Sequence, residues 1–344
     1  MLVTEDLSLE YLYGAKALCD VSFEIASGEH VAVLGGAEAG KTSLLKAIAG
    51  LYPVSSGKIF IDGKDVTEAK IKDRDILFVY DDGGLFNRRT VRYNLVYPQK
   101  VRKVPKEERE KLALDASDEF GLRGFEEEYV FRLYETEKVR LALARTALRK
   151  APLVMIDDVF GMLPSAQRGK LFHELFPRVA EISSSLLFAT TSVTEAFSVG
   201  KRVIFMRYGN IEQIGTPEEL IDDPATVNVD AYVNANRNFS EAPITHNDDG
   251  TRLNFGGYDI EILSRNYVAD GVIASYVLEA SDDGEPFEAI SRMFDGNGFV
   301  YVNAVGTKLF AGETPPHGIK VRPRKSDLRI FSLTDEKRLT FRIL

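Results

Sequence analysis

The stretch GGAEAGKT, at positions 35–42, limits most strongly what this chain can fold into. It matches the pattern GxxxxGK[ST] through Gly35, Gly40, Lys41 and Thr42. The apolar run VAVL (31–34) precedes it, and SLLKAIAG (43–50) follows it. A strand that leads through a glycine-rich turn into a helix is the context in which this pattern cradles phosphate groups.

The chemistry of such a cradle assigns a role to each type of residue. Glycines let backbone N–H groups turn toward phosphates, and the N-terminus of the following helix adds its dipole. Lys41 is expected to reach the β- and γ-phosphates, and Thr42 to hold Mg²⁺. We therefore expect a nucleotide to contact Gly35, Gly36, Ala37, Glu38, Ala39, Gly40, Lys41, Thr42 and Ser43. The alternative is a glycine-rich turn without a ligand.

Strands and helices alternate in the sequence up to about residue 235. Apolar runs predict strands at 21–25, 31–34, 58–61, 75–80, 153–157 and 185–191. Helical patterns follow at 41–49, 104–122, 135–150 and 169–182, and a hairpin with Gly209 and Asn210 at its tip is expected over 203–215. This alternation predicts a mostly parallel sheet that is covered by helices.

The pattern changes near residue 236. Short strands with Gly, Pro or Asp turns between them are indicated at 271–280, 298–311, 318–323, 327–332 and 339–344. They predict a small all-β domain, for which a barrel is favoured over a sandwich. We therefore expect an α/β domain at 1–235, with a helical subdomain at about 88–150, and a β domain at 236–344.

Composition narrows the range of functions. The formal charge of −9 and the pI of about 5.2 argue against a nucleic-acid partner, because nucleic-acid binders usually carry a basic face. Cys19 is the single cysteine, which excludes an internal disulfide and fits a reducing compartment. Neither a signal peptide nor an apolar run of about 18 residues is apparent, so we expect no membrane span. No histidine pair has metal-ligand spacing, so no metal beyond nucleotide-bound Mg²⁺ is expected.

The order of these motifs resembles the ATP-binding subunit of an ABC importer of the maltose/glycerol-phosphate type. The resemblance is strong over 20–66 and over 139–220, which includes LALARTALRKAPLVMIDD and IEQIGTPEEL. It is weaker after 236, where IKVRP and DLRIF resemble a TOBE/OB-type domain. It implies an α/β P-loop NTPase fold of the ABC type, with ATP and Mg²⁺ as cofactors. It also implies integral-membrane permease subunits and a second ATP-binding subunit as partners, at the cytoplasmic, inner face of the cell membrane.

The resemblance implies two further site residues directly. Tyr13 corresponds to the aromatic residue that stacks on adenine, although an ordinary core tyrosine is the equal alternative. Asp157, at the end of the strand LVMID, corresponds to the acidic residue that completes the Mg²⁺ shell. A buried carboxylate beside a phosphate cradle is costly unless it meets a cation, which favours this role for Asp157.

Other positions depart from the family pattern. Asp81 stands where the family has a glutamine, Asp158 where it has the catalytic glutamate, and Thr191 where it has the switch histidine. The family signature LSGGQ is replaced by LYETE at 133–137. Asp81 can still bind Mg²⁺ through water, whereas Thr191 keeps a hydroxyl but cannot shuttle a proton as histidine does.

These departures lower the expected rate of hydrolysis. Asp158 retracts the carboxylate by about 1.5 Å, and misplacements of about 1 Å can cost about 10²-fold in rate. In the family the signature closes over the partner's γ-phosphate, where one carboxylate of LYETE would cost about 4 kcal/mol. We expect an energy-coupling subunit for a sugar or polyol, paired with a second ATPase chain, whose hydrolysis is weak or partner-dependent. The alternative is a non-catalytic nucleotide-binding scaffold or regulator of a membrane transporter.

Overall fold

The computed structural model describes residues 1–11, 14–149, 151–235, 237–247, 250–255, 258–263, 271–287, 291–294, 299–302, 308–311, 319–339 and 342–343. The chain divides into two compact units, Met1–Pro217 and Glu218–Leu344. This division comes before the expected one at 235, because helix α8 (Val227–Val233) is bonded to the strands that follow it. Its buried Asp230 accepts a hydrogen bond from Ser275 Oγ at 2.5 Å and pairs with Arg237 and Arg329.

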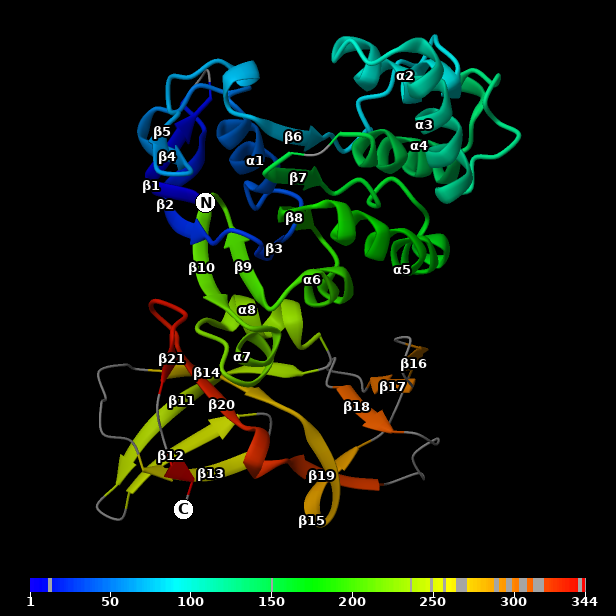
Figure 1. Cartoon of the computed structure of the whole chain (residues 1–344). Helices are drawn as coiled ribbons and strands as arrows, with labels where there is room; N and C mark the ends of the chain where they lie inside the picture. The colour runs from blue at the N-terminus through cyan, green and yellow to red at the C-terminus, as the bar shows by residue number, and fades with distance from the viewer. Residues whose placement is uncertain are drawn as a thin grey trace. The chain divides into compact units, whose positions relative to one another are not determined.

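The first unit is built around a six-stranded sheet with the order β10-β9-β3-β8-β7-β6 (Figure 1). Its strands are β3 (His30–Leu34), β6 (Ile76–Val79), β7 (Leu153–Asp157), β8 (Ser185–Thr190), β9 (Arg202–Arg207) and β10 (Asn210–Gly215). All pairings are parallel except that of β9 with β10. β7 and β8 are buried along their whole length, as strands covered on both faces are. The predicted mostly parallel sheet is thereby confirmed.

A second, antiparallel sheet of the order β2-β1-β4-β5 packs over helix α1 (Lys41–Ala49). Its strands are β1 (Leu2–Glu10), β2 (Lys16–Ile25), β4 (Ser56–Ile61) and β5 (Lys64–Asp65). Leu44, Leu45 and Ile48 of α1 share one hydrophobic core with residues of both sheets. Helix α1 has the predicted bounds, and Gly50 ends it in the left-handed conformation at φ 77°.

Helices α2 (Val91–Val101), α3 (Lys106–Glu119) and α4 (Glu135–Ala147) form a group beside the β6 edge of the parallel sheet (Figure 1). The chain continues through α5 (Ser165–Ile182) and α6 (Val193–Val199). Helix α2 lies within the helical subdomain expected at about 88–150, but no bounds were predicted for it, and its Pro98 is disfavoured in a helix interior. Its start is nevertheless well capped, since Thr90 Oγ1 accepts a hydrogen bond from Tyr93 N.

Two local expectations differ from the structure. Helix α5 begins at Ser165 rather than at 169, directly after Pro164, whose extended backbone forms the N-cap. The β9–β10 hairpin turns on Tyr208 and Gly209, with φ of 46° and 79°, one residue earlier than predicted. Two successive residues with positive φ suit the tight turn of a two-residue hairpin.

The second unit contains α7 (Pro217–Asp222) apart from its first residue, together with α8 and paired strands. Its sheets have the orders β21-β20-β14-β11-β12-β13-β22, β15-β19 and β16-β17-β18. The strands are β11 (Asn238–Asn247), β12 (Gly250–Phe255), β13 (Tyr258–Leu263), β14 (Gly271–Tyr276), β15 (Leu278–Phe287), β16 (Ser291–Phe294), β17 (Phe299–Val302), β18 (Lys308–Ala311), β19 (Ile319–Pro323), β20 (Arg329–Ser332), β21 (Arg338–Leu339) and β22 (Arg342–Ile343). Among the described residues these strands pair antiparallel. A TOBE/OB-type barrel stays a prediction.

Within the described residues no helix combines the length and the apolar character that a membrane crossing requires.

Arg74 fixes the C-terminal end of α1, and its removal is expected to destabilise the first unit. The buried guanidinium donates to the carbonyl oxygens of Ala47 and Ile48 at 3.1 and 2.7 Å, and to those of Ala69 and Thr67 at 3.1 and 2.9 Å. Arg74→Met removes the buried guanidinium that donates to these four carbonyl oxygens, of which that of Ala47 keeps its bond from Gly50 N, so we expect the free energy of unfolding to fall by about 3 kcal/mol. Urea denaturation measures this change.

The matched control is the exposed neighbour Lys72→Met, which should change the free energy of unfolding by less than about 0.5 kcal/mol. Equal losses in the two variants would mean that the carbonyl contacts of Arg74 contribute no net stability.

Candidate nucleotide-binding site

A cavity of about 460 Å³ lies where β3, β6, β7 and β8 end. Its lining includes seven residues that the sequence indicated: Ala37, Lys41, Thr42, Asp81, Asp157, Asp158 and Thr191. Asp82, Gly161, Met162 and Arg168 complete it. Ligand sites of open α/β sheets lie outside the carboxyl ends of the parallel strands. The cavity therefore joins the glycine-rich segment to the acidic residues that were expected to face it.

The glycine loop (35–40) passes so close to neighbouring backbone that side chains are excluded at two positions. A Cβ on Gly35 would lie 2.3 Å from the carbonyl oxygen of Met206. Gly40 has a φ of 97°, and a Cβ there would lie 2.7 Å from the carbonyl oxygen of Ala17. Both glycines are therefore required for the backbone path that leads from β3 into α1.

Lys41 lies across this loop. Its Nζ donates hydrogen bonds to the carbonyl oxygens of Gly35 and Gly36 at 2.8 and 2.7 Å. Burial lowers the pKa of the Lys41 amine, while the nearby carboxylates of Asp158 and Asp157 act in the opposite direction. The arrangement fixes a cation at the start of α1, where the helix dipole also favours anions.

Thr42 and Asp157 meet beneath the loop. Thr42 Oγ1 donates to Asp157 Oδ1 at 2.9 Å, and Asp157 is 1% exposed. Burial raises the pKa of Asp157 to about 6, although the bond from Thr42 opposes this shift. Its Oδ2 is buried and accepts no hydrogen bond from the described residues. A hydroxyl beside a carboxylate with an unsatisfied oxygen is a donor set that fits Mg²⁺.

Arg168 links Asp158, on the acidic wall of the cavity, to the buried Glu195. Its Nη2 donates to Asp158 Oδ1 at 2.7 Å, and its Nε donates to Glu195 Oε1 at 2.6 Å. Asp158 follows β7 with a φ of 40°, and Thr191 Oγ1 lies 3.4 Å from its Oδ2. Burial raises the pKa of Asp158, and Arg168 opposes this shift. Arg168 on α5 and Glu195 on α6 were not predicted, because no sequence motif connects residues of these two helices.

Several expected contact residues do not line the cavity. Gly35, Gly36, Glu38, Ala39 and Gly40 shape the loop, while Ser43 is buried and its Oγ shares a hydrogen bond of 2.7 Å with the Tyr11 hydroxyl. Tyr13 lies outside the described residues. Tyr11, which the sequence did not indicate, packs edge-on against Tyr52 with ring centroids 5.7 Å apart. Because Tyr11 is hydrogen-bonded to Ser43, the residue that follows Thr42 on α1, it is a second candidate for the aromatic residue that contacts the nucleotide base.

The segment LYETE places its acidic residues in the first turn of α4. The helix begins at Glu135, and Glu135 Oε1 pairs with Lys138 Nζ at 2.8 Å. Tyr134 forms the N-cap, makes no side-chain cap bond and is 81% exposed. Glu135 and Glu137 lie in the first turn of a helix that begins where the sequence predicted, and they suit the positive end of the helix dipole.

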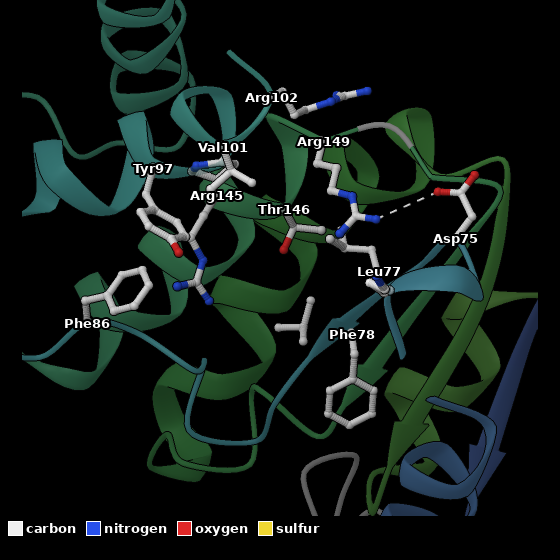
Figure 2. Close-up of a pocket in the computed structure, with 13 residues that line it drawn as sticks. Asp75, Leu77, Phe78, Phe86, Tyr97, Val101, Arg102, Arg145, Thr146 and Arg149 are labelled. Carbon is white, nitrogen blue, oxygen red and sulfur yellow. Dashed lines mark ion pairs between the residues drawn. The ribbon is translucent and has the colours of Figure 1, made fainter. Parts of the chain in front are cut away.

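A second cavity of about 530 Å³ lies between β6, α2 and α4 and is called the basic pocket (Figure 2). It is lined by Lys72, Asp75, Leu77, Phe78, Val79, Phe86, Tyr97, Pro98, Val101, Arg102, Arg145, Thr146 and Arg149. Figure 2 shows Phe86, Tyr97 and Arg145 toward one side, and Arg149 near Asp75, 3.8 Å away, toward the other. Arg145 also donates to the carbonyl oxygens of Gly84 and Gly83 at 2.8 and 2.7 Å. The basic pocket thus abuts the loop that carries Asp81 and Asp82 into the nucleotide cavity.

Comparison with known proteins identifies the family. The model of the ABC transporter family matches residues 18–161. The sulfate/thiosulfate import ATP-binding protein CysA of Nocardia farcinica is 38% identical over 209 residues, which cover 61% of this chain and 63% of that protein. CysA of Bacillus cereus is 32% identical over 307 residues, covering 87% of this chain and 83% of that protein. The sn-glycerol-3-phosphate import ATP-binding protein UgpC 3 of Agrobacterium fabrum is 32% identical, covering 67% and 66%.

This chain spans about 63% of the length of the CysA proteins of Nocardia farcinica and Synechococcus elongatus. Among solved structures, the bacterial ABC transporter cassette MJ0796 superposes with a TM-score of 0.58 at 23% identity, over 63% of this chain and 99% of that one. This likeness confirms the P-loop ABC ATPase fold. The long CysA match, the family model and the glycine loop agree, and the chain therefore belongs to the ABC transporter family.

Proposed function

We propose that this chain is the ATP-binding, energy-coupling subunit of an importer. The observation that carries this proposal is the cavity in which the glycine loop, Lys41 and the Thr42–Asp157 pair meet. The loop and Lys41 would hold the phosphates of ATP, and Thr42 with Asp157 would hold Mg²⁺. When bound, Mg²⁺-ATP would supply the phosphoanhydride bond whose hydrolysis drives import.

Three residues at the cavity are proposed to act on the attacking water and on the metal. Asp158 is the proposed base, and Thr191, whose Oγ1 lies 3.4 Å from Asp158 Oδ2, orients it. Asp81 lines the same cavity and is proposed to reach the metal through water. Their side chains are shorter than those of the family pattern or uncharged, so hydrolysis is expected to be weak or to depend on a partner.

The proposed partners are integral-membrane permease subunits and a second ATP-binding subunit. The relatives' names as import ATP-binding proteins support a place at the cytoplasmic face of a membrane. The proposed solute is a sugar or polyol, which the similarity to UgpC supports. The CysA names favour sulfate or thiosulfate instead. Uptake of radiolabelled glycerol 3-phosphate and sulfate in a strain that lacks this chain distinguishes the two solute classes.

A non-catalytic nucleotide-binding scaffold is the second candidate. Two observations favour it: Asp158 is already paired with Arg168, and the LYETE segment presents Glu135 beside the exposed Tyr134. In this case the nucleotide would stabilise the chain on its membrane partner without turnover.

Asp158→Asn separates the two candidates. Loss of a general base typically costs 10²- to 10⁴-fold, so we expect turnover of the complex with membrane and ATPase partners to fall about 10²-fold. The affinity of the isolated chain for Mg²⁺-ATP should stay within about threefold. Steady-state phosphate release and calorimetric titration measure the two quantities. Unchanged turnover of the complex would favour the scaffold.

The basic pocket is the proposed docking site for an acidic segment of the membrane partner. Lys72, Arg102, Arg145 and Arg149 face it against the single carboxylate of Asp75, and Phe86 and Tyr97 add apolar surface. An occupant with one or two carboxylates and an apolar side chain is complementary to this lining. Through Arg145, such an occupant would act on the loop that carries Asp81 and Asp82.

Arg149→Glu tests this docking proposal. Charge reversal should weaken the association with the membrane subunits at least about tenfold, while the affinity of the isolated chain for Mg²⁺-ATP stays unchanged. Co-purification from detergent at graded concentrations measures the association. Arg123→Glu is the control, because Arg123 is exposed and pairs with Asp118 away from the pocket. Equal losses in the two variants would contradict docking at the basic pocket.

A further inference from the structure

Arg168 lies between a buried carboxylate and a carboxylate that faces the nucleotide cavity. Both oxygens of Glu195, which is 2% exposed, accept from Arg168, Oε1 at 2.6 Å and Oε2 at 2.9 Å. Thr190 Oγ1 also donates to Glu195 Oε2, at 2.5 Å. This two-point contact with a buried partner fixes the plane of the guanidinium, and its Nη2 then meets Asp158 Oδ1 at 2.7 Å.

The contact between Arg168 and Asp158 matters because carboxylates outnumber cations in the lining of the cavity. Four carboxylates line it, Asp81, Asp82, Asp157 and Asp158, against the two cations Lys41 and Arg168. Lys41 is bonded to the glycine loop and Asp157 to Thr42, so Arg168 is the cation that forms an ion pair with Asp158 among the described residues. A triphosphate brings several further negative charges into this space. An unpaired carboxylate on the same wall would repel it strongly at short range.

We propose that Arg168 is a positioning residue that neutralises Asp158 and holds its carboxylate at the cavity wall, so that the site accepts a nucleoside triphosphate. The proposal rests on the proposed nucleotide-binding function. Glu195 does not line the cavity and acts indirectly, by orienting Arg168. The effect should be larger for ATP than for ADP, since ATP carries more negative charge into the cavity.

The test is a comparison of dissociation constants for Mg²⁺-ATP and Mg²⁺-ADP, measured by calorimetry on the full chain. Arg168→Gln is expected to weaken Mg²⁺-ATP binding at least tenfold and Mg²⁺-ADP binding less than threefold. Arg168→Lys keeps the charge but not the planar two-point contact with Glu195, so its affinity for Mg²⁺-ATP should lie between those of the unchanged chain and Arg168→Gln. Arg178→Gln, on the same helix but outside the cavity, is the matched control.

The decisive comparison is between Asp158→Asn and the double variant Asp158→Asn/Arg168→Gln. If Arg168 acts by neutralising Asp158, the two bind Mg²⁺-ATP within threefold of each other. A tenfold weaker double variant would show that Arg168 contacts the phosphates itself and would overturn the positioning role. Because the double variant removes one charge of each sign, it keeps the test valid even if Arg168→Gln alone does not fold.

Two other results have distinct meanings. Equal weakening of ATP and ADP binding by Arg168→Gln overturns the proposal in favour of a purely structural role. Failure of the unchanged chain to bind either nucleotide contradicts the proposed function itself, which separates that failure from an error about Arg168.

Discussion

Replacing Lys41 with alanine is expected to weaken the binding of Mg²⁺-ATP at least about a hundredfold, which corresponds to about 2.7 kcal/mol. The Nζ of Lys41 is fixed between the carbonyl oxygens of Gly35 and Gly36 at the start of α1. Charge-assisted hydrogen bonds to phosphate are among the strongest available to a protein, and alanine supplies none. Calorimetric titration of the isolated chain measures the loss.

The control for this prediction is Lys64→Ala, which removes an exposed lysine on β5 in the same unit. It should leave the affinity for Mg²⁺-ATP unchanged. If Lys41→Ala binds within threefold of the unchanged chain, the glycine loop is a turn without a phosphate ligand, as the alternative interpretation of the motif holds.

Asp157→Asn is expected to stabilise the nucleotide-free chain at pH 8 while it abolishes Mg²⁺-dependent nucleotide binding. Burial raises the pKa of Asp157 from 3.8 to about 6 in the folded chain. The folded state therefore binds this proton more tightly than the unfolded state does. The tighter binding of this proton stabilises the folded chain fully below about pH 3.8. This stabilisation, of up to about 3 kcal/mol, is lost as the pH rises through about 6.

Asparagine accepts the bond from Thr42 Oγ1 without carrying a charge, so the variant lacks this dependence. Thermal unfolding at pH 4.5 and pH 8 measures the effect: the midpoint of the variant should exceed that of the unchanged chain by much more at pH 8 than at pH 4.5. Titration with ATP at graded Mg²⁺ concentrations should show at least about a hundredfold weaker binding, because the metal loses its charged ligand. A variant less stable than the unchanged chain at pH 8 would contradict the assignment of a costly buried charge to Asp157.

The elements that carry the cradle could be predicted from sequence because they depend on local patterns. Short apolar runs bounded by turn residues indicated β3, β7 and β8, and Gly50 marked the end of α1. The bounds of α2, within the helical subdomain expected at about 88–150, could not be predicted, because its start depends on the Thr90 cap and its interior contains Pro98. The division of the chain at 217 depends on the bonds of Asp230 with Ser275 and Arg329, which are far from it in sequence.

The candidate site divides in the same way. Lys41, Thr42 and Asp157 belong to motifs whose spacing indicates their roles. Arg168 and Glu195 come together because α5 and α6 start beside the ends of neighbouring strands, and no spacing in the sequence encodes that contact. Tyr11 could not be identified from sequence, because its bond to Ser43 depends on the antiparallel sheet that lies over α1.

Arg145 belongs to the lining of the basic pocket and also clasps the carbonyl oxygens of Gly83 and Gly84. Equilibrium linkage makes any influence along this path symmetrical. If an occupant of the basic pocket tightens nucleotide binding by some factor, the nucleotide must tighten the grip on that occupant by the same factor. The affinity for a membrane partner would thus depend on bound nucleotide, and the affinity for nucleotide on the bound partner, through the same arginine. Either affinity, measured with and without the second ligand, gives the full coupling energy.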